Sequence, residues 1–152
     1  MDLFIPDNLI LQKDGSVKVR DYGKDITPKE NETLTEFYKR YQQELSKLKP
    51  YERGMWIPYE QERKLYKVQI YCQPTKPTQK EIDSWNVPRL MYEKWFLEKD
   101  TALKYAKNKI KQQSIGYFYS QDNPNHRQYT FFYNLIHDGD FETESAINGK
   151  II

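Results

Sequence analysis

The clearest hydrophobic periodicity in the chain lies between residues 33 and 49. Apolar residues recur there at every third or fourth position, which is the spacing of an amphipathic helix. Thr33 and Glu36 have the spacing of a capping box, and Pro50 stops a helix. We therefore predict a helix over residues 33–49 whose apolar stripe packs on a sheet. The stripe consists of Leu34, Phe37, Tyr38, Tyr41, Leu45 and Leu48.

Alternation of apolar and polar residues predicts strands elsewhere. Residues 65–72 alternate over most of their length. Residues 1–25 contain apolar runs on both sides of an Asp-Gly pair, which favours a tight hairpin. Residues 115–136 are rich in Tyr and Phe, and we predict a second hairpin with aromatic pairs across its strands. Residues 137–152 are expected to form a turn and a tail.

The segment 78–113 carries the densest helix signals in the chain. Thr78 and Glu81 form a second capping box, and Pro88 falls where a new helix can begin. Asp100 offers a cap for a third helix. Because proline would break one long helix, we predict a cluster of short helices over residues 78–113.

Together these elements predict a single α+β domain over residues 1–152. A small, mainly antiparallel sheet would pack against one long amphipathic helix and a cluster of short helices. A chain of this length suits one core better than two. Hydrophobic residues make up only 38% of the chain, and aromatic residues 15%. Rings, above all those of tyrosine, must therefore supply much of the core.

Charge and composition narrow the classes of function. The chain has 24 basic and 22 acidic residues, a net charge of +2, which gives no strong argument for nucleic-acid binding and speaks against a polyanionic DNA mimic. The single cysteine, Cys72, excludes an intramolecular disulfide and suits a reducing compartment. No apolar run approaches the roughly 20 residues of a membrane span, and the first residues lack a signal-peptide pattern. We expect a cytoplasmic (host cell) or virion-associated protein with no membrane partner.

Few residues suggest catalysis or metal binding. His137, Asp138 and Asp140 are of the types that bind metals, but an Asp-Gly pair after a strand is also an ordinary turn, and we favour the turn. His126 lies in a loop of turn-forming residues, and Cys72 lacks the context of a catalytic thiol. The motifs of phosphate-binding loops, serine hydrolases and zinc sites are absent from the sequence. We therefore expect no cofactor and favour a protein that is not an enzyme.

A loop provides the preferred candidate for binding. Loops carry binding residues more often than packed elements do, and Trp and Tyr are enriched at interaction hot spots. The irregular segment 50–64 holds Met55, Trp56 and Tyr59, and we predict that these three contact another protein. Lysine outnumbers arginine and alanine is scarce, as is common in proteins of AT-rich genomes. This composition suggests a phage or mobile-element protein that acts on a host or virion protein.

Nucleic-acid binding is the alternative prediction. Lys104, Lys107 and Lys111 are spaced to share one helix face, with Lys109 alongside. Such a face suits contacts with phosphates, while an aromatic sheet suits base stacking. The same lysines also suit a solvated face near a helix C-terminus, and without arginine they read bases poorly. We therefore rank a non-enzymatic protein-binding module above nucleic-acid binding.

Overall fold

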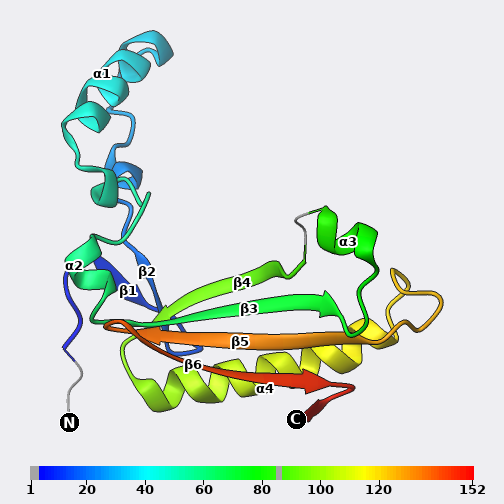
Figure 1. Ribbon diagram of the computed structural model, residues 1–152. Helices are drawn as coiled ribbons and strands as arrows, with labels where there is room; N and C mark the ends of the chain where they lie inside the picture. The colour runs from blue at the N-terminus through cyan, green and yellow to red at the C-terminus, as the bar shows by residue number, and fades with distance from the viewer. Residues whose placement is uncertain (1–3, 85–86) are drawn as a thin grey trace.

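The computed structural model describes residues 4–84 and 87–152, and it is built around one antiparallel sheet of seven strands (Figure 1). The strand order is β1-β2-β4-β3-β5-β6-β7. This mixture of helices and an antiparallel sheet confirms the α+β class that the sequence predicts. The strands are β1 (Leu9–Leu11), β2 (Ser16–Val19), β3 (Tyr66–Pro74), β4 (Arg89–Phe96), β5 (Tyr129–His137), β6 (Asp140–Ile147) and β7 (Lys150–Ile151).

One long helix, α4, lies across a single face of the sheet, and the other helical segments lie toward the two ends of the sheet (Figure 1). Within residues 4–84 and 87–152, no helix is both long enough and apolar enough to cross a membrane. The helices are α1 (Leu34–Lys47), α2 (Tyr59–Glu62), α3 (Gln79–Asp83) and α4 (Lys99–Phe118), with short 3-10 turns η1 (Tyr22–Asp25) and η2 (Pro50–Glu52).

The main core lies between α4 and the central strands. Alternate residues of β3 are buried on the α4 side, as expected of a strand whose side chains point to opposite faces in turn. From α4, Ala102, Ala106 and Ile110 meet them at one-turn spacing and are fully buried. Small side chains let the helix approach the sheet closely, so the contact is dense without large residues. The other buried members of this core are Val68, Ile70, Cys72, Phe96, Phe131, Tyr133, Leu135 and Ala146.

A second, smaller core joins the N-terminal hairpin to the rest of the sheet. Leu9 and Val17 of the hairpin are buried against Ile57 and Leu65. The partly buried ring of Trp95, on β4, packs against this group. The hairpin predicted within residues 1–25 is thus confirmed as β1 and β2, although residues 1–3 lie outside the described part of the chain.

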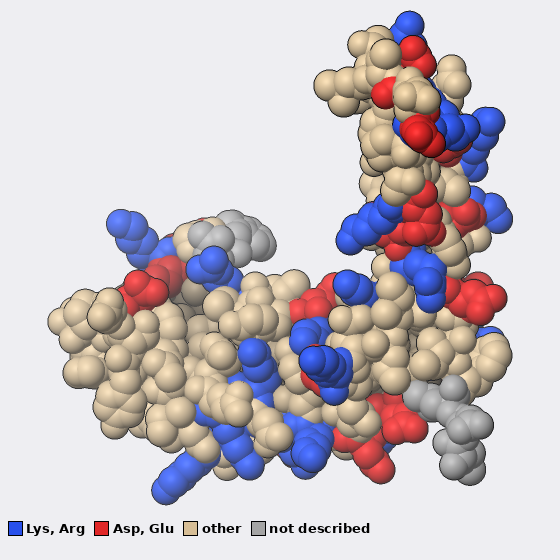
Figure 2. All heavy atoms as spheres, turned by 180° about the vertical axis from the view of Figure 1, so that it is seen from behind, with Lys and Arg blue, Asp and Glu red and all other residues tan. Residues whose placement is uncertain are grey.

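The predicted packing of the 33–49 helix on the sheet is wrong. Its start is confirmed, because the Thr33 hydroxyl accepts a hydrogen bond from the Glu36 N–H at 3.2 Å. However, α1, whose residues are all described, has no buried residue, and it does not pack extensively against any strand. Figures 1 and 2 show it standing away from the sheet. The helix that covers the sheet is α4.

The predicted cluster of short helices over residues 78–113 is wrong as well. Among the described residues of that block, only α3, which begins at the predicted Thr78–Glu81 capping box, is a short helix. Residues 89–96 form β4, which pairs with β3, and α4 runs unbroken to Phe118. The β4 segment carries apolar residues on both faces, so its pattern fits a short helix as well as a strand. Residues 85 and 86 of the predicted block lie outside the described residues.

The predicted hairpin over residues 115–136 and the predicted tail over 137–152 are also wrong. Residues 115–118 complete α4, and β5 pairs instead with β3 and β6. The β5–β6 turn has positive φ at both central residues, Asp138 (46°) and Gly139 (87°), which is the conformation of a tight hairpin turn. The strand predicted over residues 65–72 is confirmed as β3.

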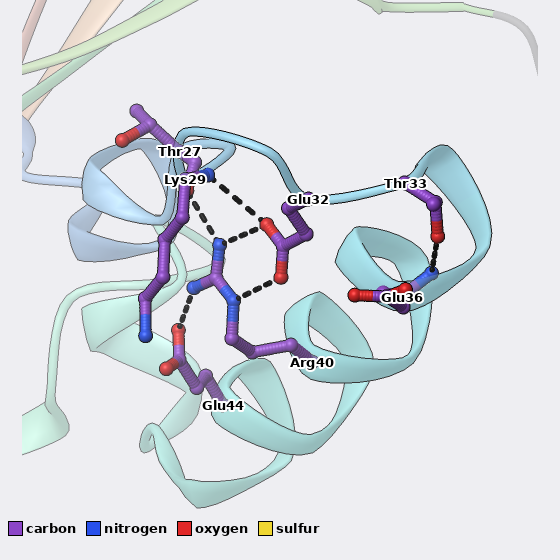
Figure 3. Close-up of polar contacts among 7 residues, drawn as sticks. All are labelled: Thr27, Lys29, Glu32, Thr33, Glu36, Arg40 and Glu44. Carbon is purple, nitrogen blue, oxygen red and sulfur yellow. Dashed lines mark hydrogen bonds and ion pairs between the residues drawn. The ribbon is translucent and has the colours of Figure 1, made fainter.

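Residues 22–49 form an arm that rises from one end of the sheet (Figure 1). Arg40 of α1 fastens the linker before the helix onto the helix itself (Figure 3). Its guanidinium donates to both carboxylate oxygens of Glu32 at 2.8 Å, to the Thr27 carbonyl at 2.6 Å and to Glu44 at 3.1 Å. This hydrogen bonding to Arg40 is the main reason that the pKa of Glu32 is lowered to about 2.

We expect Arg40→Ala to unfold the arm and leave the sheet folded. A lone helix of this length is marginal in water, and α1 has no buried residue and no extensive packing on the sheet to replace the lost bonds. Backbone NMR shifts of residues 34–47 should move toward random-coil values, while those of β3 and β5 stay unchanged. Lys39→Ala, on the same helix but exposed, is the control.

Acid should weaken the arm in the same way. A carboxyl whose pKa is lowered by folding stabilises the fold at any pH above its ordinary value, 4.5 for Glu32, and the stabilisation is lost as the pH falls toward about 2. The shifts of residues 34–47 should therefore change across that window. Arm shifts that stay constant down to pH 2 would contradict the role given to Glu32.

Candidate functional site

A groove of about 860 Å³ opens where β2 and β4 separate. The two strands pair only at Ser16 with Phe96 and at Val17 with Trp95. Beyond these positions β2 rises away with the N-terminal hairpin, and the segment from Gly54 to Ile57 borders the space that results. The residues lining the groove are Gln12, Lys13, Asp14, Ser16, Val17, Lys18, Val19, Gly54, Met55, Trp56, Ile57, Glu93, Lys94 and Trp95.

Met55 and Trp56 stand on the lip of this groove with their side chains largely in solvent. Met55 is 62% and Trp56 53% exposed, whereas the next residue, Ile57, is only 6% exposed and belongs to the smaller core. On the other side, Arg53 forms a backbone bridge with Asp21 at the base of the arm. The segment is therefore fixed at both ends. The exposure of its two apolar side chains follows from this fixed backbone and not from a loose loop.

Gly54 explains the path of the chain just before this pair. Its φ of +72° lies in the left-handed region, which residues with a Cβ rarely adopt. A Cβ at this position would also lie 3.1 Å from the Cβ of Asp21. The close approach of the segment to the base of the arm thus requires glycine.

The groove carries both charges, but its carboxylates are already engaged within the chain. Asp14 forms an ion pair with Lys94. Although burial alone would raise the pKa of Asp14, hydrogen bonds from Lys94 and Ser16 lower it to about 2. Glu93 accepts a hydrogen bond from the Gln69 amide at 2.9 Å and lies 3.6 Å from the Lys67 ammonium.

The remaining charges at the groove are basic. Lys13 and Lys18 line it, and neither forms an ion pair with any described residue. A second hollow of about 530 Å³ shares Asp14 with the groove and runs along α4, where Lys104 and Lys109 line it. Figure 2 shows Lys and Arg side chains gathered over the middle and lower parts of one side of the body. Apart from Asp100, which also lines the second hollow, the unengaged charge around the groove is therefore positive.

The structure brings together two of the three residues predicted to contact a protein. Met55 and Trp56 share the groove. Tyr59, at the start of α2, is 73% exposed but lines a different hollow, with Lys67 and Ile136 at the end of the sheet. Tyr59 is separated because Ile57, which lies between it and Trp56, is anchored in the smaller core, and α2 begins at Tyr59 itself.

Two of the lysines predicted for nucleic-acid binding, Lys107 and Lys109, lie on different sides of α4. Lys107 lies 4.0 Å from Glu144 on the β6 side of α4, whereas Lys109 lies over the Tyr92 ring on the β4 side, 4.3 Å from its centroid. Lys104 and Lys111 are exposed on α4.

One ring of the sheet joins these lysines, because Lys109 covers the partly buried ring of Tyr92 on the α4 side. Phe96, Phe131 and Tyr133, on the same side, are buried under the helix. The half-buried pair Tyr71 and Phe132, stacked at 5.1 Å, lies on the opposite face. The partly buried rings are thus divided between the two faces of the sheet, with Tyr92 beside Lys109 on one face and the Tyr71–Phe132 pair on the other. Nucleic-acid binding through these lysines stays a prediction.

The His137–Asp140 segment is a turn with local contacts. The His137 ring stacks on Tyr66 with 4.0 Å between centroids, and Asp138 pairs with Arg63 at 2.9 Å. His137 and Asp140 face each other across the hairpin. In the part of the chain that the structure describes, no group of three or more His, Cys, Asp or Glu side chains lies close enough to hold a metal ion.

The single thiol is also placed in the core. Cys72 is buried among the residues of the main core, and burial raises its pKa to about 11. A nucleophilic cysteine requires the opposite shift, because the thiolate is the reactive form. Its environment is that of a small structural side chain.

The β2 and β4 walls of the groove are not predicted by the sequence pattern. The pattern predicts a helix around Trp95, and it places Lys13 and Lys18 only in a hairpin. No local signal indicates that two strands separate after two pairs, because that depends on how the hairpin packs on Ile57 and Leu65.

Comparisons of the chain with protein-family models, with curated proteins and with solved structures found no match.

Proposed function

We propose that this chain is a non-enzymatic protein-binding module whose groove between β2 and β4 receives apolar side chains of a partner protein. The observation that carries the proposal is the exposure of Met55 and Trp56 on a segment fixed by Ile57 and Arg53. Large apolar side chains that a scaffold holds in solvent beside a hollow are typical of interaction sites.

Energetics support the same proposal. Full burial of a large apolar side chain contributes about 1.5–3 kcal/mol, so covering two half-exposed side chains supplies a useful share of a binding free energy. Trp is also the residue most enriched at binding hot spots. The polar and charged side chains around the pair would form the rim of such an interface.

The remaining features fit binding better than catalysis. The Cys72 thiol has a raised pKa, and His137 is held by a ring stack and a turn. We further propose that the partner is a host or virion protein and that the chain comes from a phage or mobile element. This second statement rests on composition alone and stays a prediction.

The test is capture of a partner by immobilised protein from a lysate of the source cell. We expect a protein that the wild type retains and that Met55→Ala/Trp56→Ala does not. The matched control is Tyr119→Ala/Phe141→Ala, which removes two exposed rings away from the groove and should retain the same protein. A retained set that is identical for all three proteins would refute the proposal.

Stability measurements keep this test interpretable. Because both side chains are more than half exposed, the double variant should lose less than about 1 kcal/mol of unfolding free energy. Ile57→Ala, by contrast, should lose about 2–5 kcal/mol because Ile57 is core. A double variant that unfolds would show that Met55 and Trp56 serve the fold.

A further inference from the structure

We propose that the groove binds its partner as a β-strand: an extended segment, in which apolar residues alternate with acidic ones, adds to the free edge of β4. This inference rests on the proposed function, and it specifies the conformation and chemistry of the partner at the same site.

The edge of β4 is the first observation. β4 pairs with β3 along its length, but it pairs with β2 only at Trp95 and Phe96. Over residues 89–94 it therefore has a strand neighbour on one side only, as far as the described residues show. Such an edge presents backbone N–H and C=O groups without partners, which is the template for strand addition. An added strand along this stretch would be roughly 20 Å long.

The groove begins at this edge. Glu93 and Lys94 line it from β4, and Lys18 and Val19 line it from β2, so the groove occupies the place that a continued β2 would fill. A partner strand placed there would extend the pairing that β2 begins at Val17 and then continue along the rest of β4.

The two sides of this edge differ in chemistry, which sets the alternation in the partner. The Met55–Ile57 segment lies on the side of the sheet away from α4, since Ile57 packs with Val17 and Trp95. Side chains of an added strand that point to this side meet Met55, Trp56 and the apolar groove floor. Alternate side chains of a strand point to opposite faces, so the next ones point toward α4.

The α4 side carries more lysines than unpaired carboxylates. Lys104 and Lys109 line the hollow there, together with Asp100 and with Asp14, which pairs with Lys94. Lys18 lies on the opposite face of β2 from Val17 and Val19, as period-two alternation requires. Neither Lys18 nor Lys104 forms an ion pair with a described residue. Acidic side chains are the complement of this row.

Charge also disfavours a second copy of the chain as the occupant. A symmetric pair of β4 edges would bring the same lysines from both copies to one interface. Like charges at close range oppose association. The edge therefore favours an acidic segment of a different protein.

The test selects peptides from a displayed library of random sequences on the wild-type protein. We expect enriched peptides to alternate apolar with acidic residues. Their affinity should fall about tenfold or more, which is about 1.4 kcal/mol, in Lys18→Glu/Lys104→Glu. The control Lys39→Glu/Lys47→Glu makes the same charge change at exposed lysines of the arm and should leave affinity unchanged. Enrichment of basic peptides, or of none, overturns the inference.

Backbone methylation of a selected peptide tests the strand itself. N-methylation removes one amide donor, and alternate amides of an edge-bound strand donate to the same neighbour. Affinity should therefore fall at every second position of a methylation scan. Losses at no position, or at consecutive positions, indicate docking by side chains alone and overturn strand addition.

The two proposals fail separately in these experiments. Peptides that lose affinity in Met55→Ala/Trp56→Ala but show no alternation in the scan leave the proposed function standing and remove strand addition. Peptides that bind the double variant as well as the wild type remove the proposed function. A concentration-dependent dimer that Lys18→Glu/Lys104→Glu alters, or displacement of the peptide by a single-stranded oligonucleotide, would overturn the choice of an acidic protein segment as the occupant.

Discussion

Replacing Phe131 with alanine is expected to lower the free energy of unfolding by about 3–5 kcal/mol. Phe131 is fully buried in the main core, between β5 and α4. Removing its ring leaves a cavity that the dense surroundings fill only in part. Urea denaturation followed by far-ultraviolet circular dichroism measures the loss directly.

Phe132 is the matched control, because it is the next residue on the same strand and points to the opposite face. It is half-buried there and stacks on Tyr71 at 5.1 Å. An aromatic pair of this kind contributes about 0.5–1.5 kcal/mol beyond its burial, so Phe132→Ala should cost far less than Phe131→Ala. Equal losses at the two positions would contradict the assignment of α4 to one face and of an open surface to the other.

Placing an aspartate at position 106 is expected to prevent folding altogether. Ala106 is fully buried where α4 crosses the central strands. A short carboxylate there has no room to reach solvent, and burying it without a partner costs several kcal/mol. We expect Ala106→Asp to lower the free energy of unfolding by more than about 4 kcal/mol, which is exceptional for a single substitution. Loss of the cooperative thermal transition is the measurement.

Leu34→Asp in α1 is the control for this change. Leu34 is 84% exposed at the first position of the helix, beside the Thr33 cap. Aspartate is favourable near a helix N-terminus, so the variant should be as stable as the wild type within about 0.5 kcal/mol. A large loss at Leu34 together with tolerance at Ala106 would mean that α1, and not α4, covers the sheet.

These two pairs address the point at which sequence pattern and tertiary structure disagree most. The strongest apolar stripe in the chain is on α1, and the stripe of α4 is made of Ala102, Ala106 and Ser114 around Ile110. Counting large apolar residues favours α1 as the packing helix. Packing favours α4, since small residues allow close approach and leave room for the rings of the sheet.

The C-terminal strands carry a local signal for hairpin turns, which the predicted tail over residues 137–152 leaves out of account. Two pairs, Asp138-Gly139 and Asn148-Gly149, bracket β6, and all four residues have positive φ. Asp-Gly and Asn-Gly are the strongest short-range signals for two-residue hairpin turns. Glu142 and Glu144, two positions apart on β6, form ion pairs with Lys99 and Lys107 of α4. The polar residues of this segment therefore belong to a strand that faces α4, and they do not indicate a tail.

The candidate site was predictable in part. The segment around Trp56 is predicted to bind because it is an irregular loop that carries Trp and Tyr, and the structure places Met55 and Trp56 in solvent beside a groove. The groove itself was not predictable. It requires β4 to be a strand and the hairpin to diverge from it, and both depend on contacts between residues far apart in the chain.

The sequence by itself determined the features that neighbouring residues decide. The Thr33 cap, the Thr78–Glu81 capping box and the strand at 65–72 depend on hydrogen bonds and alternation within a few positions. Tertiary structure alone decided that residues 89–96 are a strand, that α4 covers the sheet and that α1 stands free in the arm. The physical reason is that an apolar stripe determines how much apolar surface a segment can bury. Which segment is buried depends on how well each of them packs on the same face of the sheet.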